Sequence, residues 1–487
     1  MERTPVMDAS PLDRAPGPLA QLRYTPPPKW APSRFNARTV ADDGRMLVWN
    51  TLTGAVFEFL PQHREAALAL LTAKEVREPL DAFGKHLASK GFLVADGMDE
   101  AARFRTFFGQ QHWRQDVLEL ILLASEDCNF RCTYCYEKFR NGTMLPEVRQ
   151  GVRALVEERA PRLKQLKVSW FGGEPLYGWE ALEELGPFFR EMVDRHGLVF
   201  THDMTTNGYL LTEERATKLL EWGCNSFQIT VDGLPEDHDC KRVGRDGSPT
   251  YHVILENLRA MKARDAAFFI VLRVNFDREN FPRLAPFLEA LSEDFGGDPR
   301  FLLRFRAVGK WGGDNDEQLD TCGLDEKRWV KDELRRQAVG LGLHPEGGIE
   351  NVRFPGAHVC YAARPYNFIV GATGKLMKCT IALDEMEENV VGRITPEGRL
   401  ELSEANLIRW VTPHFETDSL CQTCYILPGC QGAACPLTRI RDGERTCCGT
   451  KANLKREMRF SLDAMARARE PKVDAPAEAA VVAAAGG

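Results

Sequence analysis

The sequence predicts an α/β protein built on a partial (β/α)6 TIM-type barrel, with a small α+β N-terminal unit before it and a cysteine-rich C-terminal domain after it. Three observations lead to this fold class. Apolar strand-like runs alternate with helical periodicity in the middle of the chain, which requires parallel strands joined by helical crossovers. Strand signals without that alternation come first. Eight of the fourteen cysteines gather after it, between residues 345 and 448.

Composition narrows the possible functions. At roughly 100 to 200 residues per domain, 487 residues predict two to four domains. A formal charge of -7 gives no electrostatic reason to expect a nucleic acid partner. No apolar run is long enough for a signal peptide core or a membrane span, so we expect a cytoplasmic protein without a membrane partner. In a reducing compartment thiols stay free, so the cysteines favour metal or iron-sulfur ligation over disulfides.

The first two segments differ in character. Residues 1–33 hold eight of the 28 prolines and are expected to be a disordered lead-in outside the fold. Residues 34–110 form the small N-terminal unit. In it, two strands (46–49 and 55–60) flank a turn at Gly54, and a further strand (91–94) follows helical periodicity.

Residues 111–310 form the predicted barrel. Its strands are expected at 118–124, 166–171, 199–205, 226–231, 268–275 and 301–307. Between them, segments rich in Ala, Leu, Glu and Arg predict helices such as 147–159, 181–195 and 212–222. In barrels of this type, the chemistry lies where loops leave the carboxyl ends of the strands.

The remaining chain divides into three segments. Residues 311–344 are expected to be a linker. In residues 345–450 regular periodicity fades, and we expect ligation to replace a large apolar core there, as in a cluster-binding domain. Residues 451–487 predict a C-terminal helix and a disordered tail.

Three cysteines follow the first barrel strand within eight residues, at Cys128, Cys132 and Cys135. A structural zinc site normally has four protein ligands, whereas a four-iron cluster held by three cysteines leaves one iron open. With three and then two residues between the cysteines, the motif resembles that of the radical S-adenosylmethionine (SAM) enzymes. The resemblance implies a [4Fe-4S] cluster that binds SAM and yields a 5'-deoxyadenosyl radical. A three-cysteine zinc site is the alternative.

Further motifs resemble the SAM-binding segments of that family. They end successive predicted strands, and the resemblance implies cofactor contacts from Gly172, Gly173, Glu174, Asn207, Thr230 and Arg242. Glycines let a backbone approach a ligand closely. Arg242 suits the SAM carboxylate because its planar fork binds both oxygens.

The C-terminal cysteines resemble the SPASM domain, which carries two auxiliary [4Fe-4S] clusters. The resemblance implies one cluster on Cys421, Cys424, Cys430 and either Cys447 or Cys448, and another on Cys360, Cys379 and Cys435. This last cluster has only three cysteines, so either Cys322 is its fourth ligand or one iron position stays open. Four residues precede Cys435 where the family usually has three. Two closed zinc sites are the alternative, and Cys224 and Cys240 are expected to be inert packed thiols.

Together the resemblances imply a radical SAM enzyme that modifies, and by preference crosslinks, a ribosomally made precursor peptide or protein. A reducing protein such as a flavodoxin or ferredoxin would be the electron donor, and the N-terminal unit a docking element for the peptide. Sulfatase maturation is the runner-up, although Thr380 stands where those enzymes carry an Asp. Asp384 and Glu385 are the nearest acid-base candidates. A non-catalytic electron carrier or a zinc-organised scaffold is the alternative from another class.

Overall fold

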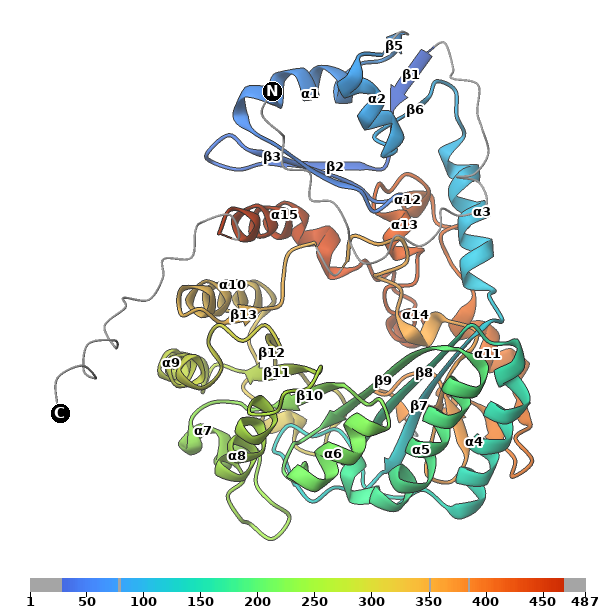
Figure 1. Ribbon diagram of the computed structural model, residues 1–487, viewed down its shortest axis with the longest axis vertical. Helices are drawn as coiled ribbons and strands as arrows, with labels where there is room; N and C mark the ends of the chain where they lie inside the picture. The colour runs from blue at the N-terminus through green and yellow to red at the C-terminus, as the bar shows by residue number, and fades with distance from the viewer. Residues whose placement is uncertain (1–28, 78–79, 350–351, 384–385, 468–487) are drawn as a thin grey trace, which may run out of the picture.

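The N-terminal unit contains two small antiparallel sheets. The computed structural model describes residues 29–77, 80–349, 352–383 and 386–467. One sheet has the order β2 (Asn36–Val40), β3 (Met46–Asn50), β4 (Val56–Phe59), and the other β5 (Val76–Arg77), β1 (Lys29–Pro32), β6 (Leu93–Ala95). Helices α1 (Pro61–Thr72) and α2 (Ala82–Ser89) pack on them, and α3 (Glu100–His112) leads to the rest of the molecule (Figure 1).

Strand β1 corrects the expected extent of the lead-in, because it lies inside residues 1–33. It pairs with β5 on one side and with β6 on the other. Trp30 packs partly buried against the core of the unit. Pro32 is the last residue of the strand, a position where a proline costs little ladder hydrogen bonding. The other residues of the expected lead-in, 1–28, lie outside the described residues.

The predicted barrel strands are all present, each to within one residue at either end. They are β7 (Val117–Ser125), β8 (Gln165–Gly172), β9 (Val199–Thr206), β10 (Ser226–Thr230), β11 (Phe269–Phe276) and β12 (Phe301–Ala307). They pair in parallel in chain order. All their carboxyl ends therefore meet at one edge of the sheet.

Helices cover one face of this sheet (Figure 1). They are α4 (Pro146–Arg159), α5 (Trp179–His196), α6 (Glu213–Glu221), α7 (Pro235–Lys241), α8 (Tyr251–Lys262), α9 (Leu284–Phe295) and α10 (Leu324–Gly340). Alternate strand residues such as Ile270, Leu272 and Val274 enter the main apolar core beneath the helices. Residues of the other parity, such as Arg273, point to the opposite side, which we call the inner face.

The same sheet continues into the C-terminal segments, which corrects two expectations. The expected linker contains α10, whose Val330, Leu334 and Ala338 enter the main core, followed by β13 (His344–Pro345), which pairs in parallel with β12. The cysteine-rich segment supplies β14 (Asn367–Val370), parallel to β7, then β15 (Lys375–Met377), β16 (Val390–Ile394) and β17 (Leu400–Leu402) in antiparallel order. The cysteine-rich segment therefore contributes strands to the main sheet, in addition to its cysteines.

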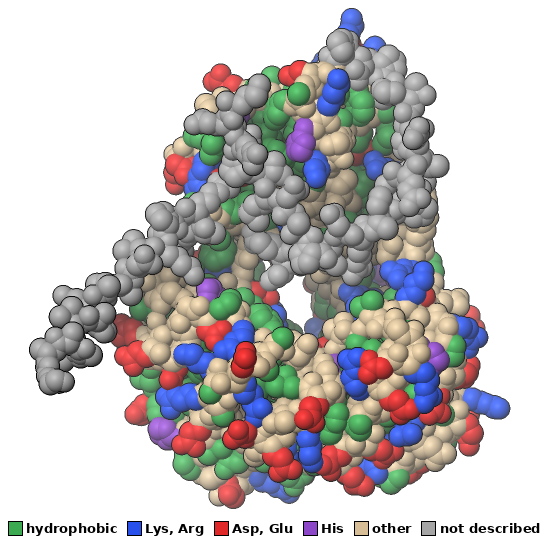
Figure 2. Space-filling model, viewed as in Figure 1, with side chains coloured by type: hydrophobic (Ala, Val, Ile, Leu, Met, Phe, Trp, Pro, Cys, Tyr) green, Lys and Arg blue, Asp and Glu red, His purple; other side chains and the backbone are tan. Residues whose placement is uncertain are grey.

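The chain returns to the N-terminal unit at its end. After α11 (Glu404–Val411), α12 (Ser419–Gln422), α13 (Leu427–Cys430) and α14 (Pro436–Asp442), helix α15 (Gly449–Arg467) packs Met458 and Leu462 against Leu47 and Trp49. The predicted C-terminal helix is therefore present, while residues 468–487 lie outside the described residues. Figure 2 shows an opening between the N-terminal unit and the α/β part of the molecule. Within the described ranges, no helix combines the length and apolarity needed to span a bilayer.

Candidate functional site

The loop after β7 carries the cysteine triad at the carboxyl edge of the sheet. Its backbone is fixed to the end of α7 and the residues that follow, since Thr133 N donates to Lys241 O and Arg131 N to Val243 O, both at 2.9 Å. Burial is the main cause that raises the pKa of the Cys128 and Cys135 thiols, and the charge of Cys132 raises both further. The three predicted ligands are therefore neighbours in space.

Two glycines at the end of β8 allow this strand to lie directly against the cysteine loop. A Cβ atom at Gly173 would stand 2.6 Å from Asp127 O and 3.2 Å from Cys128 Cβ. At Gly172, where φ is +113°, it would stand 2.2 Å from Ser125 O. From the sequence, these glycines were predicted to let the backbone approach a ligand closely. The structure adds a reason of its own, the close approach of the cysteine loop.

Changing Gly173 to Ala is expected to displace the cysteine loop, because Asp127 O and Cys128 Cβ are rigid neighbours that cannot yield to a methyl group. We expect reconstituted iron to fall by about four per chain, one [4Fe-4S] centre. Gly109→Ala is the matched control, since a Cβ there meets nothing within 4 Å. Iron content determined after anaerobic reconstitution checks this, and equal iron in the two variants would contradict it.

Glu174 ties β8 to β9 through hydrogen bonds inside the protein. Its buried carboxylate accepts from Thr206 Oγ1 and Asn207 N, both at 2.7 Å, and from Leu176 N at 2.9 Å. Burial raises the pKa of Glu174, and these hydrogen bonds oppose the rise. The side chain is thus a positioning group, which leaves only the main chain of this residue for the predicted ligand contact.

Asn207 joins the end of β9 to the cysteine loop. Its Nδ2 donates to Asn129 Oδ1 at 2.8 Å and lies 3.8 Å from Cys128 Sγ. Since Glu174 holds the backbone of Asn207, the Gly-Gly-Glu segment, the end of β9 and the first cysteine form one connected unit. The structure therefore brings these predicted site residues together.

Arg242 lies in a buried polar network beside the triad. It donates from Nη1 to Tyr134 Oη at 2.8 Å, and Tyr134 in turn donates to Asp232 Oδ2. Asn275 donates from Nδ2 to Tyr134 Oη at 3.1 Å, and its backbone N donates to Asp232 Oδ1 at 2.7 Å. Sequence reasoning gave no role to Tyr134, Asp232 or Asn275, although Tyr134 lies inside the triad motif and Asp232 lies two residues after the end of β10.

The charge of Arg242 is suited to an anionic ligand. Its positive charge opposes the rise in the pKa of Cys132 that burial causes. Its Nε is buried and has no hydrogen-bond partner among the described residues. A buried N–H of this kind is costly unless a ligand satisfies it. Thr230, the other residue predicted to meet the SAM carboxylate, is buried at the end of β10. The donor set therefore fits a carboxylate bound next to three thiols, as in SAM on an open iron.

Cys360, Cys379 and Cys435 form a second thiol group. Burial raises the pKa of Cys360 to about 11, and the charges of Cys379 and Cys435 act in the same direction. Cys322 is not among them, which removes it as the expected fourth ligand. Burial and then the carboxylate of Glu326 raise its pKa, and it packs in the main core.

A third group contains Cys421, Cys424, Cys430 and Cys448. The hydrogen bond donated by Cys448 lowers the pKa of Cys430, and the charge of Cys424 contributes to the raised pKa of Cys448. Burial raises the pKa of Cys421 to about 11, and Cys430 adds to it. Cys447 is instead exposed, with its Sγ 3.9 Å from Lys451 Nζ. The geometry therefore favours Cys448 over Cys447.

The thiol groups differ in arrangement from a site for one ion. Over the described ranges, no three or more His, Cys, Asp or Glu side chains are placed to hold a single metal ion. A four-iron cluster does not require that, because its cysteines bind different irons. Of the two expected inert thiols, Cys224 is buried in the main core as predicted. The prediction is wrong for Cys240, which is exposed on α7 and not packed.

A small cavity of about 30 Å³ lies beside the triad. Its lining includes Glu126, Glu137, Trp311, Ile381 and Leu383. Burial, and then the charge of Glu126, raises the pKa of Glu137 to about 8. Sequence reasoning missed both carboxylates. They flank the triad motif at two residues from its first and last cysteines, and this position is a signal that could have found them.

The acid-base candidates predicted from the sequence belong to the segment after β15. Asp384 and Glu385 lie outside the described residues, directly after Leu383 of the cavity. Thr380, which stands where sulfatase-maturating enzymes carry an Asp, is hydrogen bonded through Oγ1 to Tyr361 Oη at 2.7 Å. At this position the chain therefore has a hydroxyl pair and no carboxylate.

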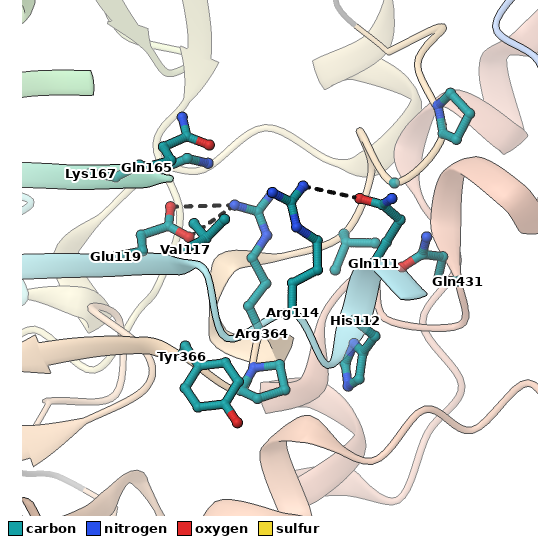
Figure 3. A pocket seen from close by; sticks show the side chains of 14 residues that line it. Gln111, His112, Arg114, Val117, Glu119, Gln165, Lys167, Arg364, Tyr366 and Gln431 are labelled. Carbon is teal, nitrogen blue, oxygen red and sulfur yellow. Dashed lines mark hydrogen bonds and ion pairs between the residues drawn. The ribbon is translucent and has the colours of Figure 1, made fainter. Parts of the chain in front are cut away.

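A second cavity, of about 250 Å³, lies at the opposite end of β7, near the amino ends of β7 and β8. Figure 3 shows Arg364 paired with Glu119 at 3.0 Å and Arg114 pointing toward Gln111. Polar side chains of β7, β8 and the C-terminal segments converge there. This cavity is separated from the cysteine triad by the length of β7.

Comparison with known proteins finds similarity in the central region of the chain. The model of the radical SAM superfamily matches residues 122–288. The chain is 28% identical over 214 residues to the radical SAM cyclopropyl synthase TigE of Paramaledivibacter caminithermalis, covering 39% of this chain and 44% of that protein. It is 28% identical over 165 residues to the cysteine-type anaerobic sulfatase-maturating enzyme of Clostridium novyi, covering 32% and 43%. The chain thus spans less than half the length of these two relatives.

A solved structure shares the fold over more of the chain. This structure, of native anSMEcpe with bound AdoMet and a Cp18Cys peptide, superposes with a TM-score of 0.53 at 18% identity. The superposition covers 72% of this chain and 98% of that one. At this level of identity the likeness concerns the fold alone.

Proposed function

We propose that this chain, in which residues 122–288 form a radical SAM domain, oxidises a peptide or protein substrate and favours crosslinking of a ribosomally made precursor. The observation that carries the proposal is the meeting of three thiols with Arg242 at the carboxyl edge of the parallel strands. Arg242 keeps a buried Nε–H without a partner there. A second and a third thiol group in the same chain support auxiliary clusters in addition to the SAM site.

The residues of the triad site have separate tasks in this proposal. Cys128, Cys132 and Cys135 would hold the SAM-binding [4Fe-4S] cluster. With SAM bound, that cofactor pair supplies a 5'-deoxyadenosyl radical that abstracts hydrogen. Arg242 would pair with the SAM carboxylate, with Thr230 at the end of the neighbouring strand. Asn207 and the main chain of Gly172, Gly173 and Glu174 would orient the rest of the ligand.

The C-terminal thiols are the proposed ligands of two auxiliary [4Fe-4S] clusters, in the manner of a SPASM domain. One set is Cys360, Cys379 and Cys435, with an open position, and the other is Cys421, Cys424, Cys430 and Cys448. Crosslinking removes two hydrogen atoms from the substrate, one to the deoxyadenosyl radical and one as a proton and an electron. Clusters held by these C-terminal thiols would supply an acceptor for that electron, and a flavodoxin or ferredoxin would be the reductant for the site at Cys128, Cys132 and Cys135. Such oxygen-sensitive centres fit the expected cytoplasmic location.

A peptide substrate is supported by the fold relatives and by the shape of the molecule. The anSMEcpe structure holds a bound Cp18Cys peptide. In this chain the opening in Figure 2 separates the N-terminal unit from the α/β part. The sheet of β2, β3 and β4 has free edges at β2 and β4 within the described chain, and an extended leader could add there as a strand. We therefore assign peptide docking to the N-terminal unit.

Formylglycine formation on a sulfatase is the second candidate, because a sulfatase-maturating enzyme is among the relatives. The hydroxyl pair of Thr380 and Tyr361 weighs against it, since it replaces the carboxylate expected of that activity. A non-catalytic electron carrier would have no need for the connected network around Arg242.

The proposed reaction is tested by incubating the reduced protein and SAM with a precursor peptide encoded beside it. We expect the peptide mass to fall by two hydrogens, with a new bond located by tandem mass spectrometry. Omitting SAM is the control, and it should leave the mass unchanged. Replacement of a cysteine thiol by an aldehyde would instead support sulfatase-type maturation, and an unmodified peptide would contradict both.

A further inference from the structure

The inner face of the sheet carries a concentration of arginines on its last long strands. Arg273 of β11 is in register with Arg304 of β12, and Asn275 is in register with Arg306. All four residues have the parity that points away from the helices. Arg306 is the closest of the three arginines to the carboxyl edge, where the cysteine triad lies.

Two of these arginines have partners. Arg304 holds Glu346 through two hydrogen bonds, at 2.8 and 3.1 Å, and donates to Gln228 Oε1 at 2.7 Å. Arg273 donates from Nε to Asn275 Oδ1 at 2.8 Å. The carboxylate of Glu346 is therefore already engaged by Arg304.

Arg306 differs from its neighbours. Among the described residues it has no hydrogen bond or ion pair, and its side chain is accessible to solvent. Desolvation is nevertheless the main cause that lowers its pKa; the carboxylate of Glu346 opposes this change, and the charges of Arg304 and Arg273 lower the pKa further.

Lys331 of α10 adds a further positive charge to this surface. Burial lowers the pKa of Lys331; the charges of Glu457 and, more weakly, Glu346 oppose this change, whereas those of Arg335 and Arg306 add to it. Glu457, the carboxylate nearest to it, is hydrogen bonded to Arg335 at 3.2 and 3.1 Å. Arg306 and Lys331 thus lie close enough to influence each other's charge, and Glu346, the carboxylate that acts on both, is hydrogen bonded to Arg304. One carboxylate shared among three cations leaves this surface with an excess of positive charge, which is unfavourable without a further anion.

We propose that Arg306 and Lys331 bind a carboxylate of the peptide substrate, either an acidic side chain or the C-terminal carboxylate. The inference rests on the proposed peptide-modifying function. A guanidinium binds a carboxylate through two parallel hydrogen bonds, which fixes its orientation as well as its position. Arg306 is in register with Asn275, which contacts Tyr134 in the triad network. The site therefore selects residues close to an acidic group for reaction.

Calorimetric titration of the reconstituted full chain with acetylated model peptides tests this inference. One peptide carries a Glu and a C-terminal amide, a second carries Gln and a free C-terminal carboxylate, and a third carries Gln and an amide. We expect a carboxylate to strengthen binding about tenfold or more, since a charge-assisted hydrogen-bonded pair contributes about 1.5 to 3 kcal/mol. The first two peptides identify which source of carboxylate is preferred.

The variants Arg306→Gln and Arg336→Gln make the test specific. Arg336 is also on α10, but it is exposed and paired with Glu333 at 2.7 Å. The preference should disappear in Arg306→Gln and persist in Arg336→Gln. The inference would be overturned if all three peptides bound equally, if none bound, or if the preference survived in Arg306→Gln. It would also be overturned if Arg306→Gln weakened the binding of SAM and left the peptide preference unchanged. Formation of 5'-deoxyadenosine by the wild type without peptide separately reports whether the proposed radical chemistry is present.

Discussion

Replacing any one of Cys128, Cys132 and Cys135 by Ala is expected to abolish the formation of 5'-deoxyadenosine from SAM. The three thiols are the proposed protein ligands of one cluster, and each is needed to hold it. Activity should fall by about a thousandfold or more, to the background of the reductant, because no other group in the site can supply the electron. Iron should fall from about twelve to about eight per chain, the loss of one four-iron centre.

Cys240→Ala is the matched control for these variants. Cys240 is exposed on α7, close in sequence to the Arg242 network but in neither of the other thiol groups. It should retain full iron and full activity. Activity that survives the loss of a triad cysteine would contradict the assignment of the SAM-binding site.

Replacing Cys448 by Ala is expected to remove a different cluster, whereas replacing Cys447 should not. Cys448 is buried, is hydrogen bonded to Cys430 and lies near Cys424, while its neighbour points to solvent beside Lys451. We expect Cys448→Ala to lose about four irons per chain. It should also weaken the packing between α15 and the N-terminal sheet, since Cys448 belongs to the core they share.

The two variants are compared by iron and sulfide analysis and by the thermal midpoint of unfolding. Cys447→Ala should match the wild type in both measurements. Equal iron loss in the two variants, or loss in Cys447→Ala alone, would contradict the ligand set proposed for this cluster.

The sequence is most informative where a local pattern determines the structure. Strands β7 to β12 alternate along the chain with helical segments, and their predicted limits agree with the structure to within one residue. The triad and the Gly-Gly-Glu segment follow such strands, so their placement at one edge of the sheet follows from the parallel order.

Long-range pairing is where prediction from sequence ends. Strand β14 joins β7 although its residues are more than 240 positions away, and nothing local in β14 indicates that partner. Helix α10 is strongly charged, which concealed the three apolar residues that it buries in the main core. Periodicity is weak in α10 because only one narrow side of the helix is buried, and β14 shows none because all four of its residues are buried.

The sequence also does not predict which groups a single side chain contacts in the folded protein. The motif identified Glu174, but its task of holding Thr206 and Asn207 depends on how β9 lies beside β8. Likewise, Cys322 could not be separated from the other cysteines by spacing; its neighbours in space separate it, because the charges that act on it come from groups such as Glu326 and not from another thiol. The distinction between Cys447 and Cys448 required the side chains to be placed in space.

The most direct test of the central claim is whether the reconstituted wild-type chain cleaves SAM. The protein is reduced with dithionite under anaerobic conditions, supplied with SAM, and assayed for 5'-deoxyadenosine and methionine by liquid chromatography and mass spectrometry. The account predicts both products in equal amounts, together with about twelve irons per chain. Bound zinc in place of iron, or intact clusters without 5'-deoxyadenosine, would contradict it.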